Sequence, residues 1–445
     1  MHPTVYRVLT VLCALVAGVP IGTNLGLVLV LWMLLTGRLL ATRGAVIPGL
    51  SALGLSPAVV RRSWAALGQG AWTADRLLPN WGTWVAQEGA WAPHTVAGYH
   101  PVAGDTTGFW RPHLRGCPTR HYSAAAGKAL PAIPVGILAR VGSADGQRLG
   151  VPLALVRAPA GEPRPRAHDQ ALVQEAVARL RAEDVLVVDR AFGVALLQEA
   201  AVPAWAVRLP KHFTARRATP PPYRGRGRPP TRGALVRPLA RRRQGKLLGA
   251  TPPDAVATWE EDGRVLRAEQ WTDLVVANAA PGAPRFQVVA VHDPRYRTPL
   301  LVASPLPLAP REVRELYRDR WPVEQVPLTG KQLLGAARQF VSAPETCQRL
   351  PELALIAGAV LTYLAATQEA VPTGFWDRHP RRTPGRLQRL LAEAPFPWNF
   401  SWPAHLRPKA AVTDHLPKGW FGQRRRATPV EAPPPLSEAA HPVAA

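Results

Sequence analysis

The chain has 445 residues, enough to bury a substantial core without depending on disulfides or metal ions. Lys and Arg number 54 against 30 Asp and Glu, which gives a formal net charge of +24, and Cys13, Cys117 and Cys347 lie far apart without metal-ligand spacing. This composition excludes a disulfide-rich secreted scaffold and favours a polyanionic partner, with nucleic acid as the leading candidate. A GC-rich genome also explains part of the Arg content.

Residues 1–95 are predicted to form a helical N-terminal domain. Its first part is an uncharged stretch between Arg7 and Arg38 whose hydropathy is typical of membrane-inserting sequence. Pro20 divides the stretch into two segments, each shorter than the roughly 20 residues needed to span a bilayer. We therefore favour two buried helices and expect no membrane partner, with membrane association as the alternative.

The segment S-A-L-G-L-S-P-A-V-V-R-R predicts a helix, a tight turn and a second helix. Gly54 is expected to end the first helix, Ser56 to cap the second and Pro57 to be its first residue. Arg61 and Arg62 on the second helix are then candidates for contacts with DNA phosphates or base edges. Two packed structural helices explain the same pattern equally well.

From residue 96 the sequence changes to short apolar runs bounded by Gly and Pro, which indicates strands. A helix is expected from about Asp169 to Arg181, followed by the buried strand V-L-V-V-D, so that residues 96–211 form an α/β layer with a partly parallel sheet. Residues 212–283 are a basic linker and a β-rich insertion, residues 284–367 resume the α/β pattern with a charged helix from near Pro310, and 368–445 are a basic, Pro-rich tail. The last twenty residues are expected to be disordered.

Asp189 is expected at the carboxyl end of its apolar strand, where α/β sheets present side chains to a ligand crevice. Asp105, in V-A-G-D-T-T, follows the first strand of the layer in a similar way. Each aspartate alone is explained as well by a local turn or a helix cap, because Asp commonly bonds nearby backbone.

A more specific pattern lies in E-L-Y-R-D-R-W-P-V-E-Q-V-P-L-T-G-K. On one ideal helix, Tyr317, Arg320, Glu324 and Lys331 would fall within an arc of roughly 60°. A carboxylate flanked by two cations and a phenol suits phosphate chemistry, with the acid holding a metal and the cations contacting DNA. The alternative is a solvated charged helix.

With these four residues, the chain resembles bacterial insertion-sequence transposases that carry a DDE triad and the signature Tyr-x2-Arg-x3-Glu-x6-Lys. The resemblance extends from about residue 98 to 365 and includes D-T-T, V-V-D-R-A-F-G and R-G-R-G-R-P-P. It implies an α/β, RNase H-like core interrupted by a β-rich insertion.

The resemblance also implies a function. Asp105, Asp189 and Glu324 would hold two Mg²⁺ or Mn²⁺ ions, with Tyr317, Arg320 and Lys331 positioning DNA, for cleavage at transposon ends and strand transfer into target DNA. The implied partners are terminal inverted repeats, target DNA and a second copy of the chain on paired ends. The implied location is the bacterial cytoplasm, associated with the nucleoid.

Two further features concern DNA. Arg224, Arg226 and Arg228 in R-G-R-G-R-P-P resemble minor-groove inserts, although a flexible basic linker has the same composition. Trp259 and Trp271 would stack on a displaced base, but tryptophans at such positions are more often part of a core.

Two residues depart from the signature pattern. Pro327 is expected to end or kink the helix near Val326, and Gly330 directly precedes Lys331, which would then leave the common face. An alternative function follows from these residues: a catalytically decayed or repurposed transposase that acts only as a DNA-binding protein.

Overall fold

The computed structural model describes residues 2–159, 165–223, 225, 232–280 and 282–406. The chain divides into two units, Met1–Arg407 and Pro408–Ala445. The second unit, including the tail that was expected to be disordered, lies outside the described residues, as do Arg224, Arg226 and Arg228.

The N-terminal region is helical, as the sequence predicts. Its helices are α1 (Pro3–Leu15), α2 (Asn24–Leu35), α3 (Arg38–Ala41), α4 (Val46–Ser51), α5 (Pro57–Gln69) and α6 (Ala74–Glu88). Gly18 and Gly22 take positive φ angles between α1 and α2, a conformation that a side chain disfavours. The turn around Pro20 therefore separates the two apolar helices at the expected place.

Burial accounts for the apolar composition of α2, in which every residue but Leu25 is buried. Among the described residues, one helix, α11 (Pro344–Thr367), is long and apolar enough to cross a bilayer. About nine-tenths of its apolar window, 89%, is covered by other parts of the protein. Length and composition alone therefore do not separate α11 from the core helix of a globular protein.

Helix α5 begins where the sequence predicts. Pro57 is its first residue, Ser56 precedes it in an extended conformation, and Gly54 has a φ of +74° after α4. The expected side-chain cap is wrong, because the Ser56 hydroxyl makes no capping hydrogen bond. Arg61 and Arg62 are both exposed on this helix.

A large mixed sheet forms the centre of the first unit. Its strands are β1 (Ala92–Pro93), β2 (His100–Trp110), β3 (Arg120–Ser123), β4 (Lys128–Ala144), β5 (Gln147–Arg157), β6 (Asp184–Val188), β7 (Trp205–Arg208), β8 (Ala215–Arg217), β9 (Leu235–Val236), β12 (Ala255–Glu261), β13 (Arg264–Val276), β14 (Phe286–His292) and β15 (Leu300–Ser304). Strands β10 (Arg241–Arg243) and β11 (Lys246–Leu248) form a separate hairpin.

The strand order along the main path is β1-β4-β2-β6-β7-β15-β14-β13-β8-β9, with β5 and β3 on β4 and β12 on β13. Strand β6 is parallel to both β2 and β7, and the other pairs are antiparallel. The predicted partly parallel sheet is confirmed. Strands from residues 212–283 do not form a separate layer, because β13 pairs directly with β14.

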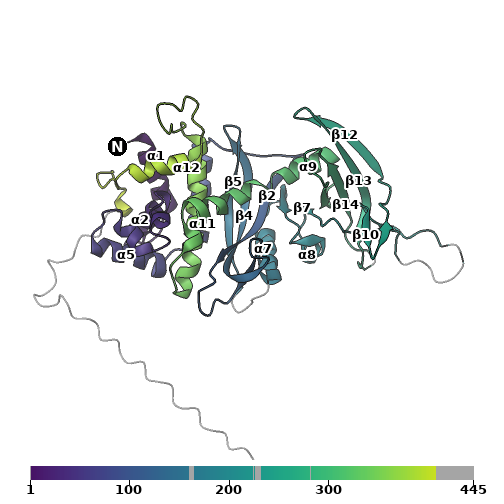
Figure 1. Ribbon diagram of the computed structural model, residues 1–445, viewed down its shortest axis with the longest axis horizontal. Helices are drawn as coiled ribbons and strands as arrows, with labels where there is room; N and C mark the ends of the chain where they lie inside the picture. Colours follow the sequence, from purple (N-terminus) through teal and green to yellow (C-terminus); the bar gives the residue numbers. More distant parts are fainter. Residues whose placement is uncertain (1, 160–164, 224, 226–231, 281, 407–445) are drawn as a thin grey trace, which may run out of the picture. The chain divides into compact units, whose positions relative to one another are not determined.

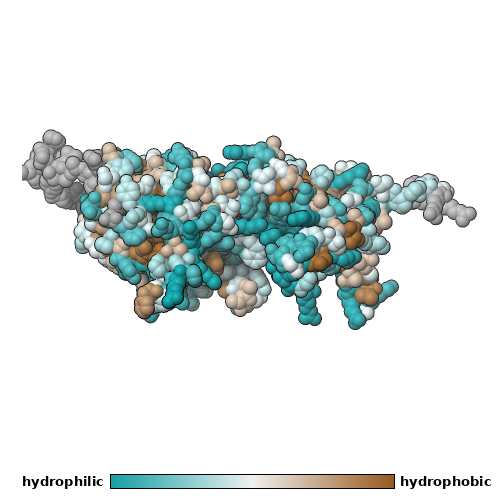
Figure 2. Space-filling model, turned by 90° about the horizontal axis from the view of Figure 1, so that it is seen from above, coloured by the Kyte–Doolittle hydropathy of each residue, from teal (hydrophilic) through white to brown (hydrophobic). Residues whose placement is uncertain are grey.

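Helices cover both faces of the sheet. They include α7 (Pro165–Arg179), α8 (Gly193–Glu199), α9 (Pro310–Arg318), α10 (Pro322–Leu328), α11 and α12 (Pro384–Glu393), with short 3-10 turns at Ala336–Arg338 and Ala404–Leu406. Helix α11 lies between the N-terminal helices and β4 and β5, where one hydrophobic core joins all three (Figure 1). Helices α7 and α8 pack on a second core on the other side of β6. Hydrophilic residues cover most of the face seen in Figure 2, with apolar residues in small separate patches.

The predicted single signature helix is wrong. Helix α9 ends at Arg318, α10 begins at Pro322, and a π-helical turn follows at Thr329–Leu333. The break precedes Pro322, because this proline has no N–H for the Arg318 carbonyl and its ring would clash with it. Asp319 fixes the break through His94 at 3.0 Å and Arg148 at 3.1 Å.

The α-helical pattern ends close to Val326, as Pro327 predicts. Helix α10 continues to Leu328, and the wider π turn begins directly after it. Gly330 has a packing role: a Cβ there would come within 2.9 Å of the Ala354 carbonyl oxygen, and one at Gly358 within 3.1 Å of the Gly330 nitrogen. These two glycines let the π turn lie directly on α11.

Candidate active site

The two candidate aspartates lie side by side on neighbouring strands. Strands β2 and β6 are parallel, and Gly104 pairs with Val188, so Asp105 and Asp189 are the next residues in the same register. Strand β6 is buried along its whole length, which fixes its position in the sheet. The sheet therefore brings together two of the predicted metal-binding carboxylates.

Asp105 is partly enclosed and poorly supplied with hydrogen-bond donors. Its Oδ1 accepts a hydrogen bond of 2.9 Å from the Thr106 backbone N–H. Burial raises the pKa of Asp105 to about 6, and the charges of Glu324 and Asp189 raise it further while Arg320 opposes the shift. Arg320, Glu324 and Asp189 are therefore close enough to Asp105 to influence its protonation.

Asp189 carries an unpaired oxygen. Its Oδ1 is buried and has no hydrogen-bond partner among the described residues. A buried carboxylate oxygen without a donor is costly, so the fold holds this group ready for a cation or a donor from outside the chain.

Glu324 enters the same neighbourhood from the first turn of α10. Arg320, which is only 4% exposed, donates from Nη2 to Glu324 Oε1. The Arg320 guanidinium also lies 6.0 Å from the ring centre of Tyr317 and 5.5 Å from that of Trp321. Burial raises the pKa of Tyr317 to about 12.

Lys331 reaches the site from the π turn. Its Nζ donates to Thr107 Oγ1 on β2 at 2.6 Å and lies 5.1 Å and 4.8 Å from the ring centres of Phe109 and Trp110. Burial lowers the pKa of Lys331 to about 8, against the attraction of Asp105. The expectation that Lys331 would leave the common surface is therefore wrong.

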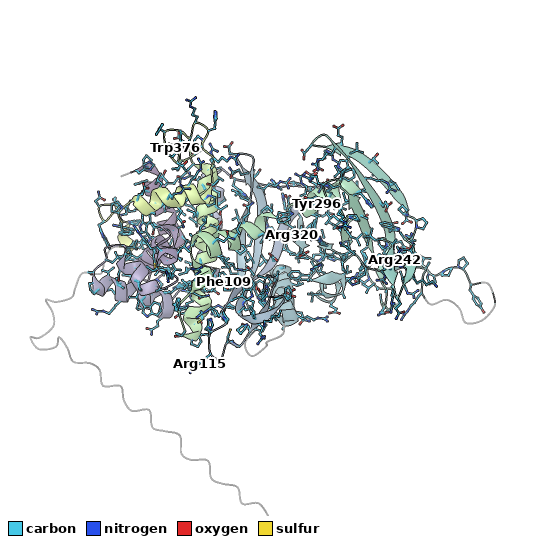
Figure 3. All side chains as sticks on the ribbon, viewed as in Figure 1. Phe109, Arg115, Arg242, Tyr296, Arg320 and Trp376 are labelled. Carbon is cyan, nitrogen blue, oxygen red and sulfur yellow. The ribbon has the colours of Figure 1, made fainter. Side chains whose placement is uncertain are left out.

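The signature residues thus converge on β2 from two helices and a π turn, rather than along one helix. Figure 3 shows Phe109 beside α11 and Arg320 further along the sheet, toward α9. Arg61 and Arg62 are not part of this site, because α5 packs with α2, α4 and α11. Trp271 is fully buried and donates from Nε1 to two carbonyls, which confirms the core interpretation, and Trp259 is partly buried.

A pocket of about 380 Å³ opens beside the two aspartates. We call it the acidic pocket; its polar lining includes Asp105, Asp189, His121, His168 and Asp169. Sequence reasoning missed the last three. The sequence offers one signal for them, the pair His168 and Asp169 in the first turn of α7. The direction in which these two side chains point depends on how α7 packs.

The missed residues extend the polar wall of the acidic pocket. Thr106 Oγ1 donates to Asp169 Oδ1 at 3.3 Å, and burial raises the pKa of Asp169 to about 6. His168 donates from Nε2 to the Val156 carbonyl at 3.0 Å, and its Nδ1 is buried without a partner among the described residues. Burial lowers the pKa of His121 to about 4, with Lys331 and His168 acting in the same direction.

The carboxylate donors suit a hard divalent cation, and the unpaired oxygen of Asp189 points to such a ligand. Among the described residues, no three His, Cys, Asp or Glu side chains stand close enough to hold a metal ion. Glu324 is engaged by Arg320, so it must release that partner before it can join the aspartates. The two aspartates therefore suit a divalent cation as they stand, whereas Glu324 suits it only after leaving Arg320.

In chemical terms, the site combines Asp105, a carboxylate with an unpaired oxygen at Asp189, a buried guanidinium and a partly buried ammonium near the ends of β2 and β6. Such a set can hold a cation and an anionic substrate together. Comparison with models of known protein families and with curated protein sequences finds no match for this chain.

Proposed function

We propose that this protein is a DNA transposase of an insertion sequence, which cleaves transposon ends and joins them to target DNA. The observation that carries the proposal is the in-register pair Asp105 and Asp189, with Glu324 approaching from α10. Strands β5-β4-β2-β6-β7 support an RNase H-like core, because two acidic residues meet where the parallel pairing of β2 and β6 ends.

Each acid has a separate part in this mechanism. Asp105 and Asp189 would hold Mg²⁺ or Mn²⁺, and Glu324 would complete the ligand set after parting from Arg320. Bound divalent ions supply charge stabilisation of an in-line phosphoryl displacement. The partly buried position of Asp105 limits competition from water for the carboxylate oxygens.

Two cations and a phenol position the DNA. When Arg320 leaves Glu324, its guanidinium is free to bind a phosphate through parallel N–H donors. Lys331 is held on β2 by Thr107 and by aromatic rings, so its ammonium is fixed in direction. Tyr317 stays protonated near neutral pH and supplies a hydroxyl donor.

The test is cleavage of the element's own terminal DNA by the purified protein with Mg²⁺ or Mn²⁺. Asp189→Ala is expected to abolish strand cleavage and to remove the thermal stabilisation that the ions give. Glu199→Ala is the matched control, because Glu199 is an exposed acid outside the site. The proposal fails if Asp189→Ala cleaves as the wild type does.

A second candidate is a catalytically decayed or repurposed transposase that only binds DNA. The Arg320–Glu324 ion pair and the separation of the possible ligands favour it. It predicts that the wild type and Asp189→Ala both bind DNA tightly and that neither cleaves DNA when a divalent metal ion is added. The packing role of Gly330 removes one of the two sequence features that suggested decay.

The same proposal covers the partners and the setting. A homodimer on paired ends, binding of terminal inverted repeats and target DNA, and a nucleoid-associated place in the bacterial cytoplasm belong to a transposase of this kind. Exposed Arg61 and Arg62 are available for phosphates on a separate surface.

A further inference from the structure

A second pocket, of about 550 Å³, lies where the end of β2 meets the turn between α3 and α4 and the segment 337–342. We call it the aromatic pocket. Its lining includes Trp110, Arg43, Arg111, Arg338, Gln339 and Phe340, and none of the described residues that line it is acidic. Its charge is therefore positive.

The backbone around the aromatic pocket is tightly fixed. Gly44 has a φ of +90°, and a Cβ there would lie 1.1 Å from the Arg338 carbonyl oxygen, so only glycine allows this approach. The Phe340 backbone N–H donates to the Gly44 carbonyl at 3.0 Å. Arg111 donates from Nη2 to the Val341 carbonyl. These contacts hold two distant chain segments in one wall.

Two kinds of side chain are exposed at the aromatic pocket. Phe340 is 77% exposed, which is unusual for a phenylalanine in a fixed turn. Arg43 and Arg338 are exposed and form no ion pair with any described residue. Together they offer an apolar ring beside two free guanidinium groups.

Gln339 supplies a polar group that lacks a partner. Its side chain is only 5% exposed, and neither its amide nitrogen nor its amide oxygen has a hydrogen-bond partner among the described residues. Both a donor and an acceptor are thus unsatisfied in one residue that lines the pocket. A rotamer change would present both to a ligand with paired polar edges.

The aromatic pocket adjoins the acidic pocket. Trp110, in its lining, lies 6.2 Å from His121 of the acidic pocket between ring centres, and 4.8 Å from Lys331 Nζ. Trp110 also follows Asp105 by five residues on β2, a span of roughly 17 Å. That length corresponds to about five nucleotides of a duplex strand.

We propose that the aromatic pocket binds one unpaired nucleotide of the DNA strand held in the acidic pocket. The base stacks on Phe340, its edge bonds to the Gln339 amide, and its phosphate lies on Arg338 and Arg43. Aromatic stacking with adjacent arginines is how proteins bind single strands, and a glutamine amide matches the donor and acceptor of a base edge. The link to the acidic pocket rests on the proposed function, whereas nucleotide binding itself does not.

The test is fluorescence anisotropy of the full chain, in EDTA, with a labelled 20-nucleotide oligo-dT and with a blunt duplex of the same length. Phe340→Ala is expected to weaken single-strand binding by about 5- to 150-fold, which corresponds to ~1–3 kcal/mol for one stacked base. Duplex binding is expected to change less than about twofold. Phe340→Trp keeps a ring and should restore single-strand affinity.

Phe375→Ala is the matched control, because Phe375 is 96% exposed and lies outside both pockets. The inference is overturned if Phe340→Ala behaves like Phe375→Ala, or if it weakens duplex and single strand equally. Thermal melting checks that each variant is folded. Because EDTA removes divalent ions, this binding result does not depend on cleavage. If the wild type fails to cleave DNA but Phe340→Ala still weakens single-strand binding selectively, only the proposed function is contradicted.

Discussion

Asp293 and the pair Asp105 and Asp189 lie on the same sheet but differ in how many arginine side chains they contact. Asp293 is buried and contacts Arg264 at 3.0 Å, Arg295 at 2.8 Å and Arg314 at 3.2 Å. Its hydrogen bond from Arg295 is the main reason that the pKa of Asp293 falls to about 2. No arginine in the described part of the chain donates such a bond to Asp105, and burial raises its pKa to about 6.

The difference separates a structural acid from a functional one. Asp293 is neutralised within the fold, so its charge contributes to the packing of α9 on β13 and β14. Burial disfavours the charged form of Asp105, and Asp189 has a buried oxygen without a hydrogen-bond partner among the described residues. Perturbed acids of this kind gather at functional sites, because binding and catalysis need groups that are not already paired.

The sharpest test of this contrast is removal of one acid from each group. If the protein has the proposed function, Asp189→Ala should lower metal-dependent strand cleavage by more than about 100-fold, since it would remove a direct metal ligand rather than an outer partner. Its folding stability should stay the same or rise, because an unpaired buried oxygen is lost. A cleavage gel and a urea titration measure the two effects. Unchanged cleavage would show that Asp189 has a structural role, as Asp293 has.

The reverse pattern is expected at Asp293. Asp293→Ala leaves Arg264 and Arg314 without this shared partner in a largely buried position. Breaking such a pair should lower the free energy of unfolding by about 3–5 kcal/mol. Urea denaturation measures this loss, and DNA cleavage per folded molecule should remain. A stable Asp293→Ala protein would contradict the structural role.

Asp105 makes the stability of the metal-free protein depend on pH. Its folded pKa of about 6 lies above the ordinary value for an aspartate, 3.8, so the folded state binds the proton more tightly. Stability from this group is therefore present below pH 4 and lost as the pH rises through about 6, by about 3 kcal/mol. Asp105→Asn should remove this slope. Unfolding curves from pH 4 to 8 in EDTA compare the two proteins, and equal slopes would disprove the assignment.

Lys331 is expected to make DNA binding fall at high pH, which is a smaller effect. Its pKa of about 8 means that the ammonium charge is lost as the pH rises through 8. DNA binding by this contact should then weaken by about tenfold between pH 7 and 9, as for one charge-assisted hydrogen bond. Lys331→Arg keeps its charge and should lose this decline. Binding measured in EDTA over this range is the test, and a decline that persists in Lys331→Arg would exclude Lys331.

Local signals gave the correct element types and several boundaries. The apolar run before Asp189 and the Gly54, Pro57 pattern predicted β6 and the start of α5, because strand burial and helix starts depend on neighbouring residues. Pro322 carried the signal for the break in the signature helix, but the spacing of the signature residues favoured one continuous helix. The residue that breaks a helix outweighs a regular spacing across it.

The rest of the site depends on packing between distant segments. Asp169 and His168 face the acidic pocket only because α7 packs beside β4 and β5. Likewise, the aromatic pocket joins Gly44 and Phe340, which are far apart in the sequence. Neither contact follows from periodicity, since periodicity identifies a buried face but not its neighbour.

The smallest expected effect concerns exposed cations remote from both pockets. Figure 3 shows Arg242 on the β10 side of the molecule, away from Arg320, and Arg242 is exposed. Arg242→Ala should weaken duplex binding modestly and lower the slope of log affinity against log salt by about 0.9, the value for one phosphate contact. Because no base edge is involved, the loss should be the same for any sequence. Salt titrations on two unrelated duplexes measure it, and a loss confined to one of them would instead assign Arg242 to base recognition.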